Sequence, residues 1–294
     1  MLELKKTWGG EVMNYRFPEV TVVGSINVDV NLTVDHLPLP GEKVTGTHLT
    51  RTLGGKGANQ AVAAAMLGAQ VSMVGALGAD VDGAWAYDQL EAQGIDTSQV
   101  REVDLATGTA MILTEPEGEH SIAIAPGANE GVSIAGVQFP ADGIILAQLE
   151  IGMDVIEELA DITPGFLVLN AAPARSLPTA VIDGADLIIV SDSELSIMPS
   201  IAGAKRTVVT YGGRGAAYFE YEHEVARTPG FPVEGVYSIG AVDAFTAAFA
   251  LAFRSGIAPL RSLEIASAVG ADVALVPHAQ TPLKPLQFYA ASVD

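Results

Sequence analysis

Short apolar runs alternate with helical segments along this chain, and that alternation limits the folds it can adopt. Residues 20–24 and 71–75 predict buried strands, and the alanine-rich residues 58–67 predict the helix between them. The alternation continues through predicted strands at 143–149, 166–169, 187–190 and 207–210 and predicted helices at 85–93, 153–160, 241–254 and 263–274. Strands that alternate with helices form a mostly parallel sheet covered on both faces, so we expect an α/β fold.

Two stretches depart from this rhythm. Residues 28–50 and residues 109–124 alternate polar and apolar side chains, the second with a turn near 116–118. Such alternation is typical of antiparallel strands with one exposed face, so we expect a small second sheet that can act as a lid. Residues 1–18 contain neither an apolar core nor a signal cleavage site, and we interpret them as an N-terminal extension to a single domain at 19–294.

Composition excludes several classes of function. The 294 residues carry a formal net charge of −20, which argues against nucleic acid and anionic membranes as partners because both attract concentrated Lys and Arg. The absence of cysteine excludes disulfides and thiolate catalysis and fits a cytoplasmic protein. The apolar runs are short and broken, so none predicts a membrane-spanning helix. The five histidines are scattered and form no metal-binding or triad motif.

One polar motif follows a predicted strand, and ligands of open α/β sheets bind beyond the carboxyl ends of strands. In G-S-I-N-V-D, Asn27 and Asp29 share a face and can hold sugar hydroxyls; alternatively, Asn27 caps a turn and Asp29 lies on the surface. In T-L-G-G-K-G-A-N-Q-A, the glycines permit close backbone approach to a ligand just before a helix, and Asn59 can reach that ligand. The motif lacks the P-loop pattern, and a tight turn before a capped helix is the alternative.

Three further motifs follow later strands. Glu150 ends the apolar run before it and can hold a metal-bound water or orient a substrate, or it is a solvated strand end. In S-D-S-E, Glu194 can help bind Mg²⁺ through water, or it belongs to a helix cap. In T-Y-G-G-R-G-A, a strand, a glycine turn and a return strand can present amides to a nucleotide, with charge from Arg214, or form a plain hairpin.

The stretch Y-S-I-G-A-V-D-A-F opens a predicted helix. Main-chain N–H groups of residues 240–243 can bind an anion, and Asp243 beside them can accept a proton from a substrate hydroxyl. The alternative is structural: Ser238 caps the helix and Asp243 complements its dipole.

Taken in order, these motifs resemble the ribokinase-like (PfkB-type) carbohydrate kinases from about residue 22 to residue 285. The stretches that carry the resemblance are G-S-I-N-V-D, P-L-P-G-E-K-V-T-G, G-G-K-G-A-N-Q-A-V-A-A-A, A-P-G-A-N, Q-L-E-I, N-A-A-P-A-R and G-A-V-D-A-F. The resemblance implies a three-layer α/β/α fold with a small β lid, which in this family often forms the contact of a homodimer. It also implies ATP as co-substrate with Mg²⁺.

The resemblance also implies residue roles. The implied sugar-binding residues are Asn27, Asp29, Gly54, Gly55, Lys56 and Asn59, and Glu150 is implied to lie near the sugar and the metal. Asp243 is the implied base, and the amides of Gly240, Ala241 and Val242 are implied to stabilise the transferred phosphoryl group. Glu194 is implied to order Mg²⁺ waters, and the implied nucleotide-binding residues are Ser191, Thr210, Gly212 and Gly215.

Departures from the family pattern cluster on the nucleotide and cation side. Tyr237 replaces an aspartate and removes an expected K⁺ ligand, which argues against K⁺ activation. Val242 replaces a glycine, so it either crowds the phosphate or occupies a backbone conformation that valine resists. Ser191 replaces an asparagine, His278 lies where the family often has glycine, and the segment between Glu194 and Thr207 is short.

The most favoured function is an ATP-dependent kinase acting on the primary hydroxyl of a pentose, D-ribose above others. A nucleoside kinase and a catalytically impaired sugar-binding protein are the alternatives.

Overall fold

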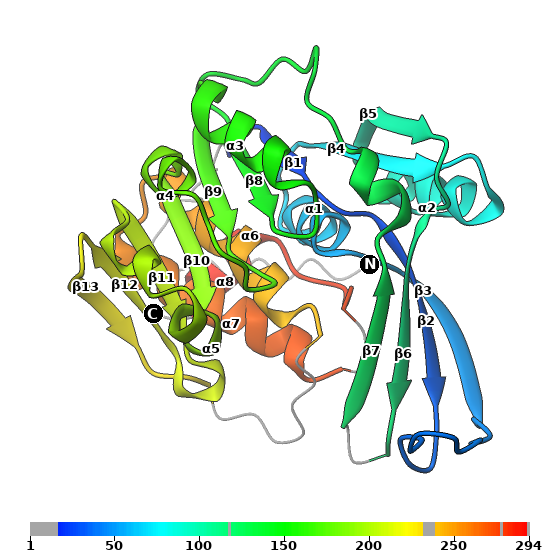
Figure 1. The fold of residues 1–294 in the computed structure, drawn as a ribbon. Coiled ribbons are helices and arrows are strands. Elements are labelled where there is room, and N and C mark those ends of the chain that lie inside the picture. The colour runs from blue at the N-terminus through cyan, green and yellow to red at the C-terminus, as the bar shows by residue number, and fades with distance from the viewer. Residues whose placement is uncertain (1–16, 117–118, 232–238, 277–278, 293–294) are drawn as a thin grey trace, which may run out of the picture.

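A nine-stranded sheet with the strand order β13-β12-β11-β10-β9-β8-β1-β4-β5 forms the centre of the molecule in the described part of the chain (Figure 1). The computed structural model describes residues 17–116, 119–231, 239–276 and 279–292. The sheet consists of β1 (Val20–Val23), β4 (Val71–Gly78), β5 (Asp96–Val103), β8 (Ile144–Gln148), β9 (Phe166–Asn170), β10 (Leu187–Ser191), β11 (Arg206–Thr210), β12 (Ala216–Glu220) and β13 (His223–Thr228). Neighbouring strands from β11 to β5 are parallel, whereas β12 and β13 add an antiparallel edge.

Helices cover both faces of this sheet, so each face has its own apolar core. One core is formed with α1 (Lys56–Met66), α2 (Val81–Ala92), α6 (Ala241–Arg254), α7 (Pro259–Ala274) and α8 (Leu286–Ser292). The other is formed with α3 (Met153–Ile162), α4 (Thr179–Gly184) and the segment around α5 (Asp192–Ile197). Val22 and Val23, adjacent in β1, point into different cores. Burial on both faces explains why these strands are uninterrupted apolar runs. The expected three-layer α/β fold is confirmed.

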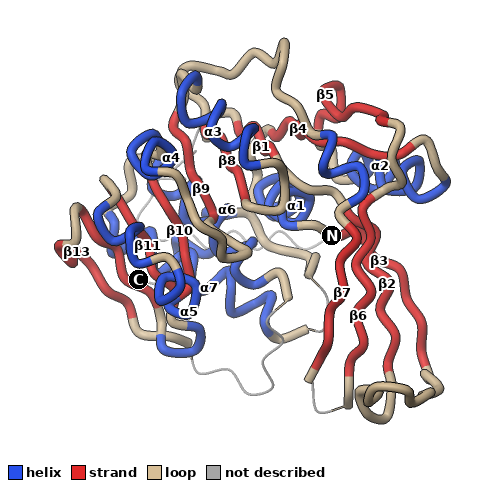
Figure 2. Tube along the Cα trace, viewed as in Figure 1, coloured by secondary structure: helices blue, strands red, loops and turns tan. Residues whose placement is uncertain are grey.

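A four-stranded sheet extends away from this helix-covered body (Figure 2). Its strand order is β3-β2-β6-β7, formed by β2 (Asn27–Thr33), β3 (His48–Gly54), β6 (Gly108–Thr114) and β7 (His120–Ala125). The alternating stretch at 28–50 is therefore two strands joined by residues 34–47. Antiparallel pairing is confirmed for β2 with β3 and for β6 with β7.

One pairing in this small sheet differs from the prediction, because β2 and β6 are parallel. The reason lies in the chain path. β2 follows β1 and β6 follows β5, and both β1 and β5 belong to the parallel part of the large sheet. Two strands that continue from parallel strands leave in the same direction. Alternation in sequence indicates which face of a strand is exposed, but it does not indicate the direction of its neighbour.

Element boundaries were predicted less well than element types. α7 begins at Pro259, before the predicted residue 263, because proline is favoured in the first turn of a helix. β5 was not predicted. The short segment after Glu194 holds the rest of α5 and a 3₁₀ turn at Pro199–Gly203. Residues 1–16 of the proposed extension, Tyr237, Ser238 and His278 lie outside the described residues. None of the helices in the described ranges combines the length and the apolar character needed to cross a membrane.

Candidate active site

Asn27 and Asp29 lie at the start of β2, where the chain passes from the large sheet into the small one. Only 3% of Asn27 and 7% of Asp29 is exposed, so the alternative of a turn cap and a surface carboxylate does not hold. Asn129, which follows β7, fixes Asn27 in place: its Nδ2 donates to Asn27 Oδ1 over 2.7 Å, and its Oδ1 accepts from the N–H of Ile26 over 2.8 Å. Asn129 ends the A-P-G-A-N stretch, and no role was predicted for it.

The carboxylate of Asp29 is buried without a full set of partners. Its Oδ1 has no hydrogen-bond partner within the described ranges. A side chain at Gly54 would overlap this carboxylate, so the glycine is required at that position. Burial, and to a smaller extent the nearby Glu150 and Asp243 carboxylates, together raise the pKa of Asp29 to about 7. An acceptor that is buried and unsatisfied is well suited to a hydroxyl donor from a ligand.

Glu150 joins the glycine-rich turn to the end of β1. Its Oε2 accepts from Ser25 Oγ over 2.6 Å and from the N–H of Lys56 over 2.9 Å. It is therefore not a solvated strand end. Gly55 precedes α1 with a φ of 84°, a conformation that favours glycine. Because a glycine N-cap has no side chain, Glu150 Oε2 accepts from the N–H of Lys56 and Ser25 Oγ accepts from the N–H of Gly57 over 3.3 Å. Ser25 was not predicted as a site residue.

The Lys56 ammonium faces a group of carboxylates. Asp243 raises the pKa of Lys56 most, burial lowers it, and Glu150 and Glu194 raise it further. Lys56 thus supplies positive charge at this site, although the protein as a whole carries a formal net charge of −20.

Helix α6 begins at Ala241 with Gly240 as its N-cap, at a φ of 78°, and no side chain within the described ranges caps it. Ser238, the capping residue of the alternative interpretation, lies outside the described residues. Val242 lies in the first turn of α6, and the positive φ angles of non-glycine residues in the described ranges are at Tyr221 and Glu222. The proposed backbone strain at Val242 is therefore wrong: a helical residue at this position needs no glycine.

Asp243 is 3% exposed and receives two side-chain amides. Gln60 Nε2 donates to its Oδ1 over 3.0 Å, and Asn59 Nδ2 lies 3.4 Å from its Oδ2. Burial raises the pKa of Asp243, while Lys56 and the two amides act in the opposite direction and Glu150 adds to the rise.

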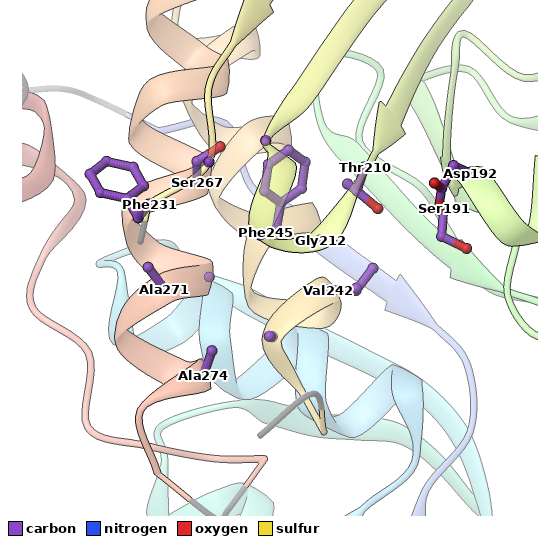
Figure 3. Close-up of a pocket in the computed structure, with 15 residues that line it drawn as sticks. Ser191, Asp192, Thr210, Gly212, Phe231, Val242, Phe245, Ser267, Ala271 and Ala274 are labelled. Carbon is purple, nitrogen blue, oxygen red and sulfur yellow. The ribbon is translucent and has the colours of Figure 1, made fainter. Parts of the chain in front are cut away.

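A cavity of about 320 Å³ opens beside the start of α6 (Figure 3). It brings together the residues predicted to bind a nucleotide, namely Ser191, Thr210, Gly212 and Gly215, and the first helical residues, Ala241 and Val242. The T-Y-G-G-R-G-A stretch is thus a hairpin between β11 and β12 that also lines this cavity. Arg214 donates to Asp192 at its edge.

The opposite wall of the cavity was not predicted. Phe231, Phe245 and small residues of α7 line it, among them Ser267, Ala271 and Ala274 (Figure 3). Their helical spacing places them on one face of α7, and this stripe of small side chains was the available signal. The small side chains leave room for the cavity beside α7.

Ser191 and Glu194 form a capping box at α5. Ser191 Oγ accepts from the N–H of Glu194 over 3.2 Å, and Glu194 Oε2 accepts from the N–H of Ser191 over 2.9 Å. The cap interpretation of S-D-S-E is therefore confirmed. It does not remove Glu194 from the site, because its charge still acts on Lys56.

The model of the pfkB family of carbohydrate kinases matches residues 18–285. The chain belongs to this family. It is 37% identical over 254 residues to a ribokinase of Bacillus subtilis, a match covering 81% of this chain and 86% of that one. Its structure is similar to that of a Thermotoga maritima ribokinase, with a TM-score of 0.84, 27% identity and coverage of 94% and 99%. Ribokinase of Arabidopsis thaliana complexed with ribose and ATP gives a TM-score of 0.80, 26% identity and coverage of 94% and 98%.

In this carbohydrate kinase, Asp243 lies between two different environments. On one side are the buried polar groups around Asp29 and Glu150. On the other side is the cavity that begins at Ala241 and Val242. A carboxylate in the first turn of α6 is thus positioned between a polar binding region and a largely apolar one.

Proposed function

We propose that this kinase transfers the γ-phosphoryl group of ATP to the primary hydroxyl of D-ribose or a closely similar pentose. The observation that carries the proposal is the position of the buried Asp243 carboxylate, between the unsatisfied Asp29 carboxylate and the cavity at the start of α6. The similarity to ribokinases, one of them complexed with ribose and ATP, supports this choice of substrates.

On the sugar side, Asp29 accepts hydrogen bonds from sugar hydroxyls, and the Asn27 side chain, held by Asn129, lines the same region. Gly54 and Gly55 keep the backbone close to the sugar, and Lys56 and Asn59 complete the contacts. Glu150 holds the glycine-rich turn against Ser25 through its two short hydrogen bonds. Removing the carboxylate of Asp29 or that of Glu150 is expected to weaken sugar binding.

The chemical step is an in-line displacement at phosphorus. The oxygen of the primary hydroxyl forms a bond to the γ-phosphorus, the bond from that phosphorus to the oxygen of ADP breaks, and the hydroxyl proton passes to Asp243. The N–H groups of Gly240, Ala241 and Val242 are the donors assigned to the transferred group, at a helix start that no side chain of the described ranges caps.

ATP occupies the cavity lined by Ser191, Thr210, Gly212 and Gly215, with its base against the apolar wall. Mg²⁺ belongs to the proposal as well, because the phosphates of ATP carry charge that a bound cation neutralises, and Mg²⁺ usually keeps most of its waters. Glu194 fits this role because it lies near Lys56 and can hold waters rather than the ion itself. Bound Mg²⁺ neutralises charge on the phosphates.

A cytoplasmic location and a homodimer through the small sheet complete the proposal. The outer face of that sheet exposes Leu49 and Met111, which favours contact with a second apolar surface. Sedimentation of the purified protein measures the oligomeric state directly.

The decisive experiment measures ADP release from Mg-ATP with and without D-ribose, in the wild type, in Asp243→Asn and in the exposed control Asp88→Asn. We expect ribose-dependent ADP from the wild type and the control, and at least about 10³-fold less from Asp243→Asn, with sugar binding by calorimetry retained. Equal turnover in wild type and Asp243→Asn would refute the assignment of the base. Nucleoside-dependent ADP alone would indicate a nucleoside kinase, and sugar binding without any turnover a sugar-binding protein.

A further inference from the structure

Behind Asp243 lies a group of fully buried amide side chains. Gln60 comes from α1, Gln148 from the end of β8 and Asn170 from the end of β9, and none of the three exposes any surface. Three amides in such a position are costly unless they bond to one another, because water cannot reach them. The roles described so far for this site use none of them.

The hydrogen bonds of these amides run in one direction only. Asn170 Nδ2 donates over 3.2 Å to the carbonyl oxygen of Ile189, and a main-chain carbonyl can only accept. Asn170 therefore presents its Oδ1 to Gln60, which donates to it from Nε2 over 3.2 Å. The same Nε2 donates to Asp243 Oδ1 over 3.0 Å.

Gln148 fixes the other end of the Gln60 amide. Its Nε2 donates over 2.7 Å to Gln60 Oε1, so a flipped Gln60 would direct its own NH₂ at another NH₂. Asn170, whose own orientation is set by the Ile189 carbonyl, thus excludes the flipped orientation. Gln148 supports the observed one through its bond to Gln60 Oε1, while its own Oε1 has no partner in the described part of the chain. The consequence is that the NH₂ of Gln60, and never its oxygen, faces the Asp243 carboxylate.

The second carboxylate oxygen of Asp243 is held more loosely. Asn59 Nδ2 is 3.4 Å from Oδ2, and Asn59 is itself oriented by Gln280, whose Nε2 donates over 3.0 Å to Asn59 Oδ1 and over 3.0 Å to the carbonyl of Leu53. Because Oδ1 has the shorter bond, Oδ2 is the oxygen left to accept the hydroxyl proton.

We propose that Gln60 is a positioning residue for the base Asp243, that Asn170 fixes the direction of its hydrogen bond, and that Gln148 supports that direction. The inference rests on the proposed function, in which Asp243 accepts the proton. A donor aimed at a carboxylate stabilises the ionised form, which is the form that can act as a base. Lys56 acts in the same sense, whereas burial and, to a smaller extent, Glu150 favour the protonated form. The carboxylates of Asp29 and Asp243 also repel each other. Gln60 thus helps keep the base ionised in a buried site.

The test replaces Gln60 by methionine, which has a similar length and no hydrogen-bonding amide. Gln93→Met, at an exposed glutamine after α2, is the matched control. The kcat and the KM for ribose are measured across pH 5.5–9 for each protein, together with thermal unfolding. For Gln60→Met we expect kcat to fall roughly 10- to 100-fold, the size of a lost hydrogen bond to a charged group, with the KM for ribose within about threefold of wild type.

The decisive readout is the low-pH limb of the kcat profile, which reports ionisation of the base in the substrate complex. We expect that limb to move to higher pH in Gln60→Met and to stay in place in Gln93→Met. Gln148→Met leaves Gln60 present but removes the group that holds its oxygen. It is expected to lower kcat about 3- to 10-fold and to move the limb in the same direction, so it also serves if Gln60→Met fails to fold.

Two results would overturn the inference while leaving the proposed function intact. One is a wild-type kcat in folded Gln60→Met. The other is a lowered kcat with an unmoved low-pH limb in both variants, which would make the role of Gln60 merely structural. A wild type without ribose-dependent turnover would instead overturn both proposals.

Discussion

Replacing Asp29 by asparagine is expected to stabilise the free protein and, at the same time, to abolish its sugar binding. The Asp29 carboxylate is buried, and its Oδ1 has no hydrogen-bond partner in the described part of the chain. Its pKa rises from the ordinary value of 3.8 to about 7, mainly through burial and further through Glu150 and Asp243. In the unfolded chain the group has its ordinary pKa, so the ionised carboxylate is penalised only in the folded state.

The size of the effect follows from that difference. A rise from 3.8 to about 7 corresponds to about 4 kcal/mol at 1.36 kcal/mol per pH unit, and relaxation of the surroundings lowers this to about 2–4 kcal/mol. Below pH 3.8 the carboxyl is protonated in both states and nothing is lost. As the pH rises from 3.8 to about 7, the folded state retains a proton that the unfolded state releases, so the free energy of unfolding falls, and above about 7 the loss is complete.

The assay is urea unfolding at pH 5 and pH 8 for the wild type, Asp29→Asn and the exposed control Asp88→Asn. We expect Asp29→Asn to exceed the wild type by about 2–4 kcal/mol at pH 8 and by less than half of that at pH 5. The control is expected to match the wild type at both pH values. A variant that is less stable than the wild type at pH 8, or that gains equally at both pH values, would show that the buried charge carries no such penalty. Calorimetry with D-ribose is expected to show no binding by Asp29→Asn.

Two further substitutions test the geometry of the site. Gly54→Ala places a methyl group against the Asp29 carboxylate and is expected to raise the dissociation constant for ribose at least about tenfold by calorimetry. The control is Gly203→Ala, whose added methyl group meets nothing within 4 Å, and it is expected to leave that constant unchanged. Equal affinity for ribose in the two variants would contradict the overlap at Gly54. Val242→Ala shortens a side chain that lines the cavity. It is expected to raise kcat/KM for ATP up to about tenfold and to change the free energy of unfolding by less than about 1 kcal/mol. A lower kcat/KM would show that the Val242 side chain contributes to ATP binding and does not crowd the phosphate.

The layers of the fold could be predicted because strands that are buried on both faces appear in the sequence as uninterrupted apolar runs. It also predicted most of the polar groups that meet around Asp243, since glycine-rich turns and carboxylates follow the predicted strands. Alternation revealed the small sheet but not the parallel pairing of β2 with β6, because the direction of a neighbouring strand is set by the path of the chain.

The amides behind Asp243 could not be predicted for a different reason. Gln60, Gln148 and Asn170 are far apart in sequence, and glutamine and asparagine are usually exposed, so nothing local marks them as buried. Glu194 posed the opposite problem: its local pattern indicated a cap, which the structure has, while its proximity to Lys56 depends on tertiary packing.

The connections between the two sheets are also where the proposed sugar ligands lie. Asn27 begins β2 just after the chain leaves β1, Gly54 and Gly55 return it from β3 to α1, and Asn129 follows β7 on the way back. Any rotation of the small sheet must bend the chain at these residues and so change the distances between them. Affinity for the sugar is therefore expected to change whenever the angle between the two sheets changes. A crosslink that held the sheets at a fixed angle would set the affinity without touching a single residue that contacts the sugar.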